Sequence, residues 1–339
     1  MDAPSAAPQT PLNCDMVVIG ASAGGVDALR RLAASLPGNY RGSLFIVLHT
    51  PSDGPSLLPG ILARAGPLPV QRADNGTPIR AGHIYVAPPD RHLLVERGRL
   101  DVVRGPRENR HRPAIDPLFR SAAWAYGPRV VGVVLTGQQD DGTAGLWAVK
   151  SCGGTTVVQD PDEAEYPSMP TNALMHNRID HRVRLAELPA LLCRLADTPV
   201  DPGAWSLPTP PGLREEIGFA KMDEDLRTAT RLGRPTPFTC PSCHGALWEL
   251  DEGGHLRYRC HTGHAFSQDS MVSEQGIAME ESLYIALRTV EERAAVLRRL
   301  AERWPQHLPG VREDYTRRAE ELDRTIDALR NLLVRPVPA

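Results

Sequence analysis

Three short segments of the chain combine a reactive side chain with small or polar turn residues. Ser22 lies in the segment GASAGG, His49 begins the segment HTP, and Asp141 lies in the segment TGQQDDG. Serine, histidine and aspartate are the parts of a nucleophilic hydrolase, in which histidine removes the serine proton and aspartate orients the imidazole. Ser22, His49 and Asp141 are therefore the candidate catalytic residues.

Each of these segments follows a short apolar run that is typical of a buried strand, at residues 15–20, 43–48 and 130–135. Helical patterns alternate with the apolar runs, which predicts an α/β fold with a doubly wound, mostly parallel sheet in three α/β/α layers. The carboxyl ends of parallel strands share one edge of a sheet, and ligands bind at that edge. Residues far apart in the sequence can therefore meet there.

Spacing alone leaves two other interpretations of GASAGG open. A glycine-rich turn between a strand and a helix can also bind a phosphate, but the segment lacks the G-x-G-x-x-G spacing of dinucleotide sites. The turn could also be purely structural. If the chain is a hydrolase, its order Ser, His, Asp and its lack of G-x-S-x-G separate it from the α/β-hydrolases.

Six ordered motifs make about residues 15–195 similar to the catalytic domain of CheB-type protein-glutamate methylesterases. The motifs are IGASAGG, LHTP, DNG with GHIYVAP, HRPAIDPLF, LTG with a following DG, and MP. The resemblance implies hydrolysis of glutamyl methyl esters on chemoreceptors by Ser22, His49 and Asp141 without a catalytic cofactor. Many members of that family also deamidate receptor glutamines. The resemblance assigns the oxyanion donors to the backbone of Ala23 and Gln138.

Several positions depart from the family pattern. Ala23 stands where threonine is usual, Thr50 where methionine is usual and Ser168 where glycine is usual, and the family's Met-Gly-Asn run is replaced by residues 138–140, Gln-Gln-Asp. These changes favour an acceptor that differs from a standard chemoreceptor, for example a similar helical signalling protein. A catalytically weakened scaffold or binding module in a chemosensory pathway is the alternative.

Three further residues are candidate substrate contacts, namely Arg112, Asp116 and Met169. The segment around the first two has a second interpretation, because an acidic residue in the first turn of a helix also stabilises that helix. Only 14 residues precede the first predicted strand, so we expect no receiver domain and no control by aspartyl phosphate within the chain.

Composition and breakers divide the chain into five parts. Proline is dense just after residue 196, as expected for a linker and for neither a helix nor a central strand. We expect a disordered tail at 1–12, a catalytic domain at 13–196, a Pro-rich linker at 197–236, a zinc-ribbon-like module at 237–270 and a helical hairpin at 271–335.

Four residues of the ribbon-like module have the spacing of metal ligands. Cys240, Cys243, Cys260 and His264 form a C-x2-C…C-x3-H pattern, which supplies three thiolates and an imidazole to a structural zinc ion. His261 is the competing fourth ligand. Free thiols or a disulfide are the alternatives to a metal. Two predicted strands with a Gly-Gly turn between the inner cysteines complete the expected ribbon.

The two C-terminal segments carry apolar residues at alternating spacings of four and three, which predicts a heptad seam and a helical hairpin. The hairpin could pair with itself, with receptor helices, or with a second copy and so cause self-association. With 38 basic and 41 acidic residues, the chain is not expected to bind nucleic acid. We also expect no membrane insertion and a cytoplasmic location.

Overall fold

The computed structural model describes residues 12–206, 209–252, 255–303 and 309–334. The chain divides into two compact units, Met1–Ser270 and Met271–Ala339. The predicted disordered tail lies outside the described residues except for Leu12. The other predicted boundaries remain predictions, and each unit is described by itself.

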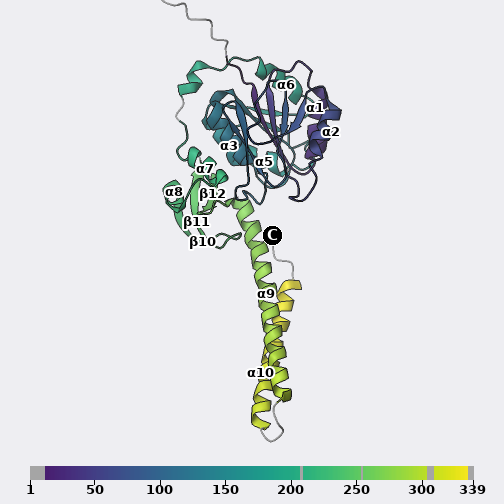
Figure 1. Ribbon diagram of the computed structural model, residues 1–339, viewed down its shortest axis with the longest axis vertical. Coiled ribbons are helices and arrows are strands. Elements are labelled where there is room, and N and C mark those ends of the chain that lie inside the picture. The colour runs from purple at the N-terminus through teal and green to yellow at the C-terminus, as the bar shows by residue number, and fades with distance from the viewer. Residues whose placement is uncertain (1–11, 207–208, 253–254, 304–308, 335–339) are drawn as a thin grey trace, which may run out of the picture. The chain divides into compact units, whose positions relative to one another are not determined.

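The first unit is built on a sheet flanked by helices (Figure 1). The sheet has seven strands, and every neighbouring pair of strands is parallel. The strand order is β3-β4-β2-β1-β7-β8-β9. Every residue of the three central strands is buried, which explains why the sequence there reads as unbroken apolar runs. The strands are β1 (Met16–Ala21), β2 (Ser43–Leu48), β3 (Val70–Arg72), β4 (Ile84–Val86), β7 (Val130–Val134), β8 (Thr155–Gln159) and β9 (His181–Val183).

Helices cover both faces of this sheet and form two separate apolar cores. Val17 and Ile19 of β1 point into one core, and Met16 and Val18 point into the other, as the two-residue period of a strand requires. This confirms the predicted doubly wound, three-layer α/β fold. The first core is closed by α1 (Gly25–Ser35), α2 (Leu58–Ala65) and α6 (Leu188–Ala196), and the second by α3 (Ile115–Tyr126), α4 (Thr143–Ser151) and α5 (Ser168–His176).

A second, antiparallel sheet of four strands follows in the same unit, and we call it the ribbon. It consists of β10 (Arg234–Thr239), β11 (Ala246–Glu252), β12 (His255–Cys260) and β13 (Ala265–Ser267). Strands β11 and β12 pair as the predicted hairpin. Gly253 and Gly254 of its predicted turn lie outside the described residues. A two-stranded hairpin, β5 (His92–Glu96) with β6 (Arg99–Val103), belongs to the first part of the unit.

The segment expected to be a Pro-rich linker contains three short helices, η2 (Pro202–Ser206), α7 (Leu213–Lys221) and α8 (Leu226–Leu232). No proline lies between residues 212 and 234, so the backbone there is free to form helices. Helix α7 buries Leu213, Phe219 and Ala220 together with the charged Glu216. Helix α7 therefore has a buried face, although much of its sequence is polar.

Five charged side chains form a buried ion cluster where the ribbon meets α3 and α7. Its members are Glu108, Arg120, Glu216, Arg257 and Arg259, and each side chain is at most 3% exposed. The Nη2 atom of Arg259 lies 3.1 Å from Glu108 Oε1 and 2.7 Å from Glu216 Oε2. Because buried charges are tolerated only when they are paired, the cluster stabilises the packing of the ribbon against α3 and α7.

Removing one acid from this cluster tests its role. Burial alone would raise the pKa of Glu216, but the guanidinium groups of Arg259, Arg257 and Arg120 outweigh it and hold this pKa well below its usual range. We expect Glu216→Gln to lower the free energy of unfolding by about 3–5 kcal/mol in urea denaturation near neutral pH.

The same reasoning predicts the pH dependence of that loss. A lowered pKa stabilises the fold above the usual pKa of glutamate, and this stabilisation disappears as the pH falls through the lowered value. The deficit of Glu216→Gln should therefore shrink in acid. The control is Asp162→Asn, because Asp162 is an 85% exposed ion-pair partner whose replacement should change stability little. Equal stability of Glu216→Gln and this control would contradict the role of the cluster.

The second unit contains α9 (Gln268–Arg303) from Met271 onward and α10 (Pro309–Val334). Glu291 pairs with Arg330 at 2.7 Å, and Arg298 pairs with Asp323. Arg298 lies later in α9 than Glu291, and its partner Asp323 lies earlier in α10 than Arg330, so the two helices are antiparallel. Ala294, Leu297, Ala301, Ala319 and Ile326 of the predicted seam are buried. This agrees with the expected hairpin, although Trp304 lies outside the described residues.

Within the described residues, no helix has the length and apolar character needed to cross a membrane.

Candidate active site

The three candidate catalytic residues lie just beyond the carboxyl ends of neighbouring strands. In the register of β1 and β2, Ala21 is opposite Leu48, so the next residues, Ser22 and His49, follow side by side. The Ser22 N–H donates to the carbonyl of Thr136 at 3.0 Å, in the loop between β7 and Asp141. The strand order reverses at β1, because β2, β4 and β3 follow it in one direction across the sheet and β7, β8 and β9 in the other. Open α/β sheets bind ligands at such a position.

His49 and Asp141 are in direct contact. The Nε2 atom of His49 lies 2.7 Å from Asp141 Oδ2, and the two side chains are 5% and 2% exposed. Asp141 Oδ2 also accepts the N–H of Ile115 at 2.7 Å, and its Oδ1 accepts the Asn109 amide at 3.0 Å. Burial alone would raise the pKa of Asp141, but the hydrogen bond and charge of His49 reverse this effect and hold the pKa well below its usual range. Asp141 is therefore ionised and holds the His49 proton on Nε2.

The other ring nitrogen of His49 is left to act on a substrate or a nucleophile. Its Nδ1 atom is buried and has no hydrogen-bond partner within the described part of the chain. Ser22 is half-buried, and its Cβ lies 2.8 Å from the point where a Cβ on Gly137 would stand. Among the contacts of the described residues, Ser22 makes no side-chain hydrogen bond to His49. Such bonds are often long in a free enzyme and shorten when substrate binds.

A second histidine covers the His49 ring. The ring centroids of His49 and His111 are 3.5 Å apart, and the ring planes are within 10° of parallel. Burial, with the nearby His49, lowers the pKa of His111 to about 3. His111 is therefore uncharged near neutral pH, so it can pack on His49 without opposing the positive charge that His49 acquires as a base.

The predicted oxyanion donors, Ala23 and Gln138, lie in the turns that follow β1 and β7. No hydrogen bond among the described residues uses the backbone N–H of Ala23 or Gln138, whereas the Gly137 N–H is engaged by the carbonyl of Tyr166 at 2.9 Å. The Thr136 hydroxyl donates to the Ala23 carbonyl at 3.1 Å and so joins the two turns. Both N–H groups are thus available among the described residues, as oxyanion donors must be, and their role stays a prediction.

A pocket of about 340 Å³ opens beside Gln138. The Ser168 hydroxyl and the Asn172 amide both donate to the Gln139 carbonyl, at 3.1 and 2.9 Å, and fix one wall of this pocket. Gln138 and Ser168, two of the residues that differ from the expected family motifs, therefore both line this pocket. The lining residues are Gln138, Tyr166, Pro167, Ser168, Thr171 and Asn172.

The three predicted substrate contacts all make contacts within the protein. Arg112 binds Asp90 Oδ1 through its Nε at 2.9 Å, and the carbonyl of Gly105 at 2.7 Å. Asp116 is 1% exposed and accepts the N–H of Gly145 at 2.7 Å, and Met169 is fully buried. These contacts favour a role in holding the loops around the site, and substrate contact by these residues remains a prediction.

Sequence reasoning did not single out Asn109, whose amide joins Asp141 to Asp116 at 3.0 and 2.9 Å. Its φ of 47° lies in the left-handed region, which asparagine tolerates better than most residues. A polar residue in a loop carries no periodic pattern. An asparagine among charged residues was the only available signal.

Asp140, next to the candidate catalytic aspartate, provides a prediction about pH and stability. Its side chain is buried and accepts the Ser267 hydroxyl at 2.7 Å. Burial raises the pKa of Asp140 from 3.8 to about 6. The folded state therefore holds this proton more tightly than the unfolded state, and the contribution of Asp140 to stability falls as the pH rises from about 4 to about 6.

Asp140→Asn removes this penalty and keeps an acceptor for Ser267. We expect the variant to match the wild type near pH 4 and to be more stable by about 1–3 kcal/mol near pH 8. Urea unfolding at both pH values measures the difference, with the exposed Asp162→Asn as the control. A difference that does not change with pH would contradict the raised pKa.

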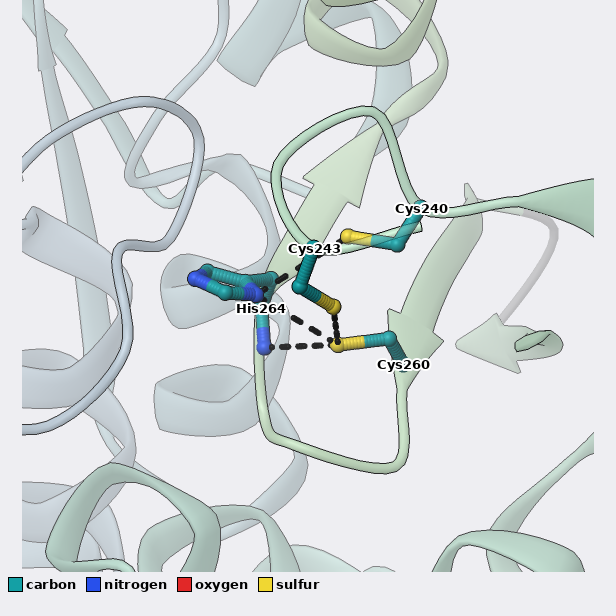
Figure 2. A group of neighbouring side chains, drawn as sticks. All are labelled: Cys240, Cys243, Cys260 and His264. Atoms are coloured by element: carbon teal, nitrogen blue, oxygen red, sulfur yellow. Dashed lines mark hydrogen bonds between the residues drawn. The ribbon is translucent and has the colours of Figure 1, made fainter. Parts of the chain in front are cut away.

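The candidate metal ligands of the ribbon lie together (Figure 2). The ligand atoms of Cys240, Cys243, Cys260 and His264 are all within 4.8 Å of one another. The sulfur atoms of Cys243 and Cys260 are 3.8 Å apart, and Cys260 Sγ is 3.6 Å from His264 Nδ1. A tetrahedral zinc ion with bonds of about 2.3 Å to sulfur and 2.0 Å to nitrogen spaces its ligands by about 3.5–3.8 Å. The donor set therefore fits zinc. His261, the competing ligand, is not part of this group among the described residues.

The fold and the carboxyl edge of the sheet thus define an α/β protein with the parts of a nucleophilic hydrolase. Residues 17–192, just over half of the chain, match the family model described as CheB methylesterase, so the chain belongs to the CheB methylesterase family. The resemblance seen in the sequence is confirmed, and with it the enzyme class expected there, a carboxylic ester hydrolase.

Individual relatives agree with this assignment. A putative protein-glutamate methylesterase/protein-glutamine glutaminase of Leptospira interrogans is 36% identical over 185 residues, which cover 54% of this chain and 96% of the relative. A protein of that name from Anaeromyxobacter dehalogenans is 36% identical over 190 residues, 56% of each chain. The crystal structure of the Thermotoga maritima CheB methylesterase catalytic domain matches with a TM-score of 0.51 and 30% identity, over 53% of this chain and 98% of that one.

Proposed function

We propose that this chain hydrolyses glutamyl methyl esters on a helical signalling protein, with Ser22, His49 and Asp141 as its catalytic triad. The observation that carries the proposal is the 2.7 Å contact between His49 and the buried Asp141, made beside Ser22 at the ligand-binding edge of the sheet. Relatives named protein-glutamate methylesterase support the choice of ester.

The geometry supplies each step of an acyl transfer. Ser22 Oγ attacks the ester carbonyl while His49 Nδ1 takes its proton, and the oxyanion is bound by the N–H groups of Ala23 and Gln138. His49 then protonates the departing methoxide, which leaves as methanol. A water molecule, deprotonated by His49, attacks the acyl-serine and frees the glutamate carboxylate and Ser22. Asp141 stays ionised and stabilises the imidazolium throughout.

The substrate side of the proposal rests on the pocket beside Gln138. A glutamyl side chain that projects from a helix can reach Ser22 while neighbouring residues of that helix contact the pocket wall. The same acyl chemistry with ammonia as leaving group would deamidate glutamine, the second activity in the names of the relatives. Gln138 and Ser168 are the residues by which this chain would select its own acceptor protein.

The direct test is release of labelled methanol from receptor cytoplasmic fragments that carry isotopically labelled methyl esters. We expect labelled methanol with wild-type protein and ammonia from fragments that carry glutamine. Alkaline hydrolysis of the same fragments provides the total amount of ester. Fragments that keep all their label, together with no reaction of Ser22 with an active-site serine probe, would overturn the proposal in favour of the scaffold alternative.

We also propose that the ribbon holds one structural zinc ion through Cys240, Cys243, Cys260 and His264. Such an ion supplies folding free energy, because a small sheet buries too little apolar surface to be stable alone. The catalytic steps above need no metal. Self-association through α9 and α10 and a cytoplasmic location remain predictions.

A further inference from the structure

One asparagine connects the candidate catalytic aspartate to the ribbon. The Asn109 side chain is 2% exposed, and its Nδ2 donates to Asp141 Oδ1 at 3.0 Å and to Asp116 Oδ2 at 2.9 Å. Its Oδ1 accepts the N–H of Ser267 at 2.9 Å and the hydroxyl of Ser270 at 3.3 Å. Every donor and acceptor of this amide is therefore used, and the two serines determine which end of the amide faces Asp141.

The ribbon makes a second contact to the same loop. The Ser267 hydroxyl donates to Asp140 Oδ1 at 2.7 Å and lies 2.9 Å from the Ser270 hydroxyl. Ser267 and Ser270 are at most 1% exposed. Ser267 therefore has two routes to Asp141. Its N–H binds Asn109, whose amide binds Asp141, and its hydroxyl binds Asp140, the residue before Asp141.

The backbone places Ser267 at this position. The Asn109 N–H donates to the carbonyl of Ala265 at 2.9 Å, and Glu108 forms a bridge with Ala265. Ala265 begins β13, directly after the candidate metal ligand His264. Strand β13 thus pairs with the ribbon on one side and with the loop that carries Asn109 on the other.

We propose that Ser267 of the ribbon is a positioning residue of the esterase, which orients the catalytic Asp141 through Asn109 and Asp140. The inference rests on the proposed function, because it takes Asp141 as the catalytic aspartate. Without the contacts from the ribbon, the Asn109 amide can turn over and present its oxygen to Asp141, which destabilises the orientation that His49 requires. The ribbon is then a part of the active site and not only an appended module.

The test compares Ser267→Ala, Ser270→Ala and Asn109→Asp with the wild type in methanol release and in the rate of Ser22 labelling by a fluorophosphonate probe. Because none of these residues lines the pocket beside Gln138, we expect kcat to fall and KM to change less than about twofold. We expect a fall of about tenfold for Ser267→Ala and of about a hundredfold for Asn109→Asp, which sets a second carboxylate against that of Asp141.

A spectroscopic measurement separates positioning from general structural damage. The proton shared by His49 Nε2 and Asp141 gives a strongly downfield proton resonance, and we expect this signal to shift or broaden in Ser267→Ala and Asn109→Asp. The matched control is Ser242→Ala, which removes an exposed hydroxyl from the same ribbon and should leave kcat, KM and the resonance unchanged. Circular dichroism and metal content verify that each variant is folded.

The outcomes distinguish the two proposals. Wild-type protein that neither releases methanol nor reacts with the probe at Ser22 would defeat the proposed function itself. Wild-type protein that does both, with Ser267→Ala and Ser270→Ala equal to it in kcat and in the downfield resonance, would overturn the positioning role. Ser267→Ala removes the hydroxyl that binds Asp140, and Ser270→Ala removes the hydroxyl that binds Asn109. The two variants together therefore test both routes to Asp141 even if Asn109→Asp does not fold.

Discussion

Replacing Ser22 with alanine should reduce methanol release about 10⁴- to 10⁶-fold, the range found when a triad nucleophile is removed. The serine contributes the only hydroxyl in the turn after β1, where it lies next to His49 in the strand register. Without it, His49 can only activate water, and no acyl-enzyme forms. Methanol release under saturating substrate measures the effect.

The control for this substitution is Ser52→Ala. Ser52 is an exposed serine in the loop after His49, so its loss should leave kcat and KM at the wild-type values. His49→Gln is expected to cost about as much as Ser22→Ala, and the double variant little more, because the two residues act as a unit. Purified Ser22→Ala that releases methanol at the wild-type rate would remove the triad from the mechanism.

Removing the metal should have the second largest effect. Native mass spectrometry should find one zinc ion per chain, and Cys243→Ser should lose it. Zinc binding to small ribbon and finger modules contributes about 10–16 kcal/mol of apparent free energy at neutral pH, far more than the ribbon's few buried apolar side chains can replace. We therefore expect the metal-free ribbon to unfold, with rapid proteolysis between residues 234 and 267.

Two variants make the metal test specific. Cys193→Ser changes a cysteine outside the ligand group and should keep the zinc ion, and His261→Ala should keep it as well if His264 is the fourth ligand. Full zinc content in Cys243→Ser, or a protease-resistant ribbon after chelation, would contradict the structural role of the metal. Loss of zinc in His261→Ala would make His261 the fourth ligand in place of His264.

The central sheet could be predicted from the sequence because its strands are buried on both faces and therefore read as continuous apolar runs. The short edge strands and α5 carry a weaker signal. Helix α5 has Pro170 in its first turn and buries only Met169, Pro170 and Ala173, so its sequence shows no clear amphipathic face. Such an element is determined by the packing around it and not by its own periodicity.

The positions of Ser22, His49 and Asp141 could be predicted because each follows a strand whose direction is known once the sheet is taken as parallel, whereas their catalytic roles stay predictions. The positions of Asn109 and Ser267 could not, because they depend on how the ribbon docks. Glu216 shows the same limit. In the sequence it is one acid in a polar helix, and only the folded chain brings three arginines from α3 and β12 around it.

If Ser267 positions Asp141 as proposed, the chain gains its full activity only late in its synthesis. A nascent chain that has emerged as far as α6 already contains Ser22, His49 and Asp141. The side-chain oxygen of Asn109, Oδ1, still lacks both of its donors at that stage. Those donors arrive only with residues 267 and 270. On this proposal, a chain cut short before Ser267 contains Ser22, His49 and Asp141 but should lack full esterase activity.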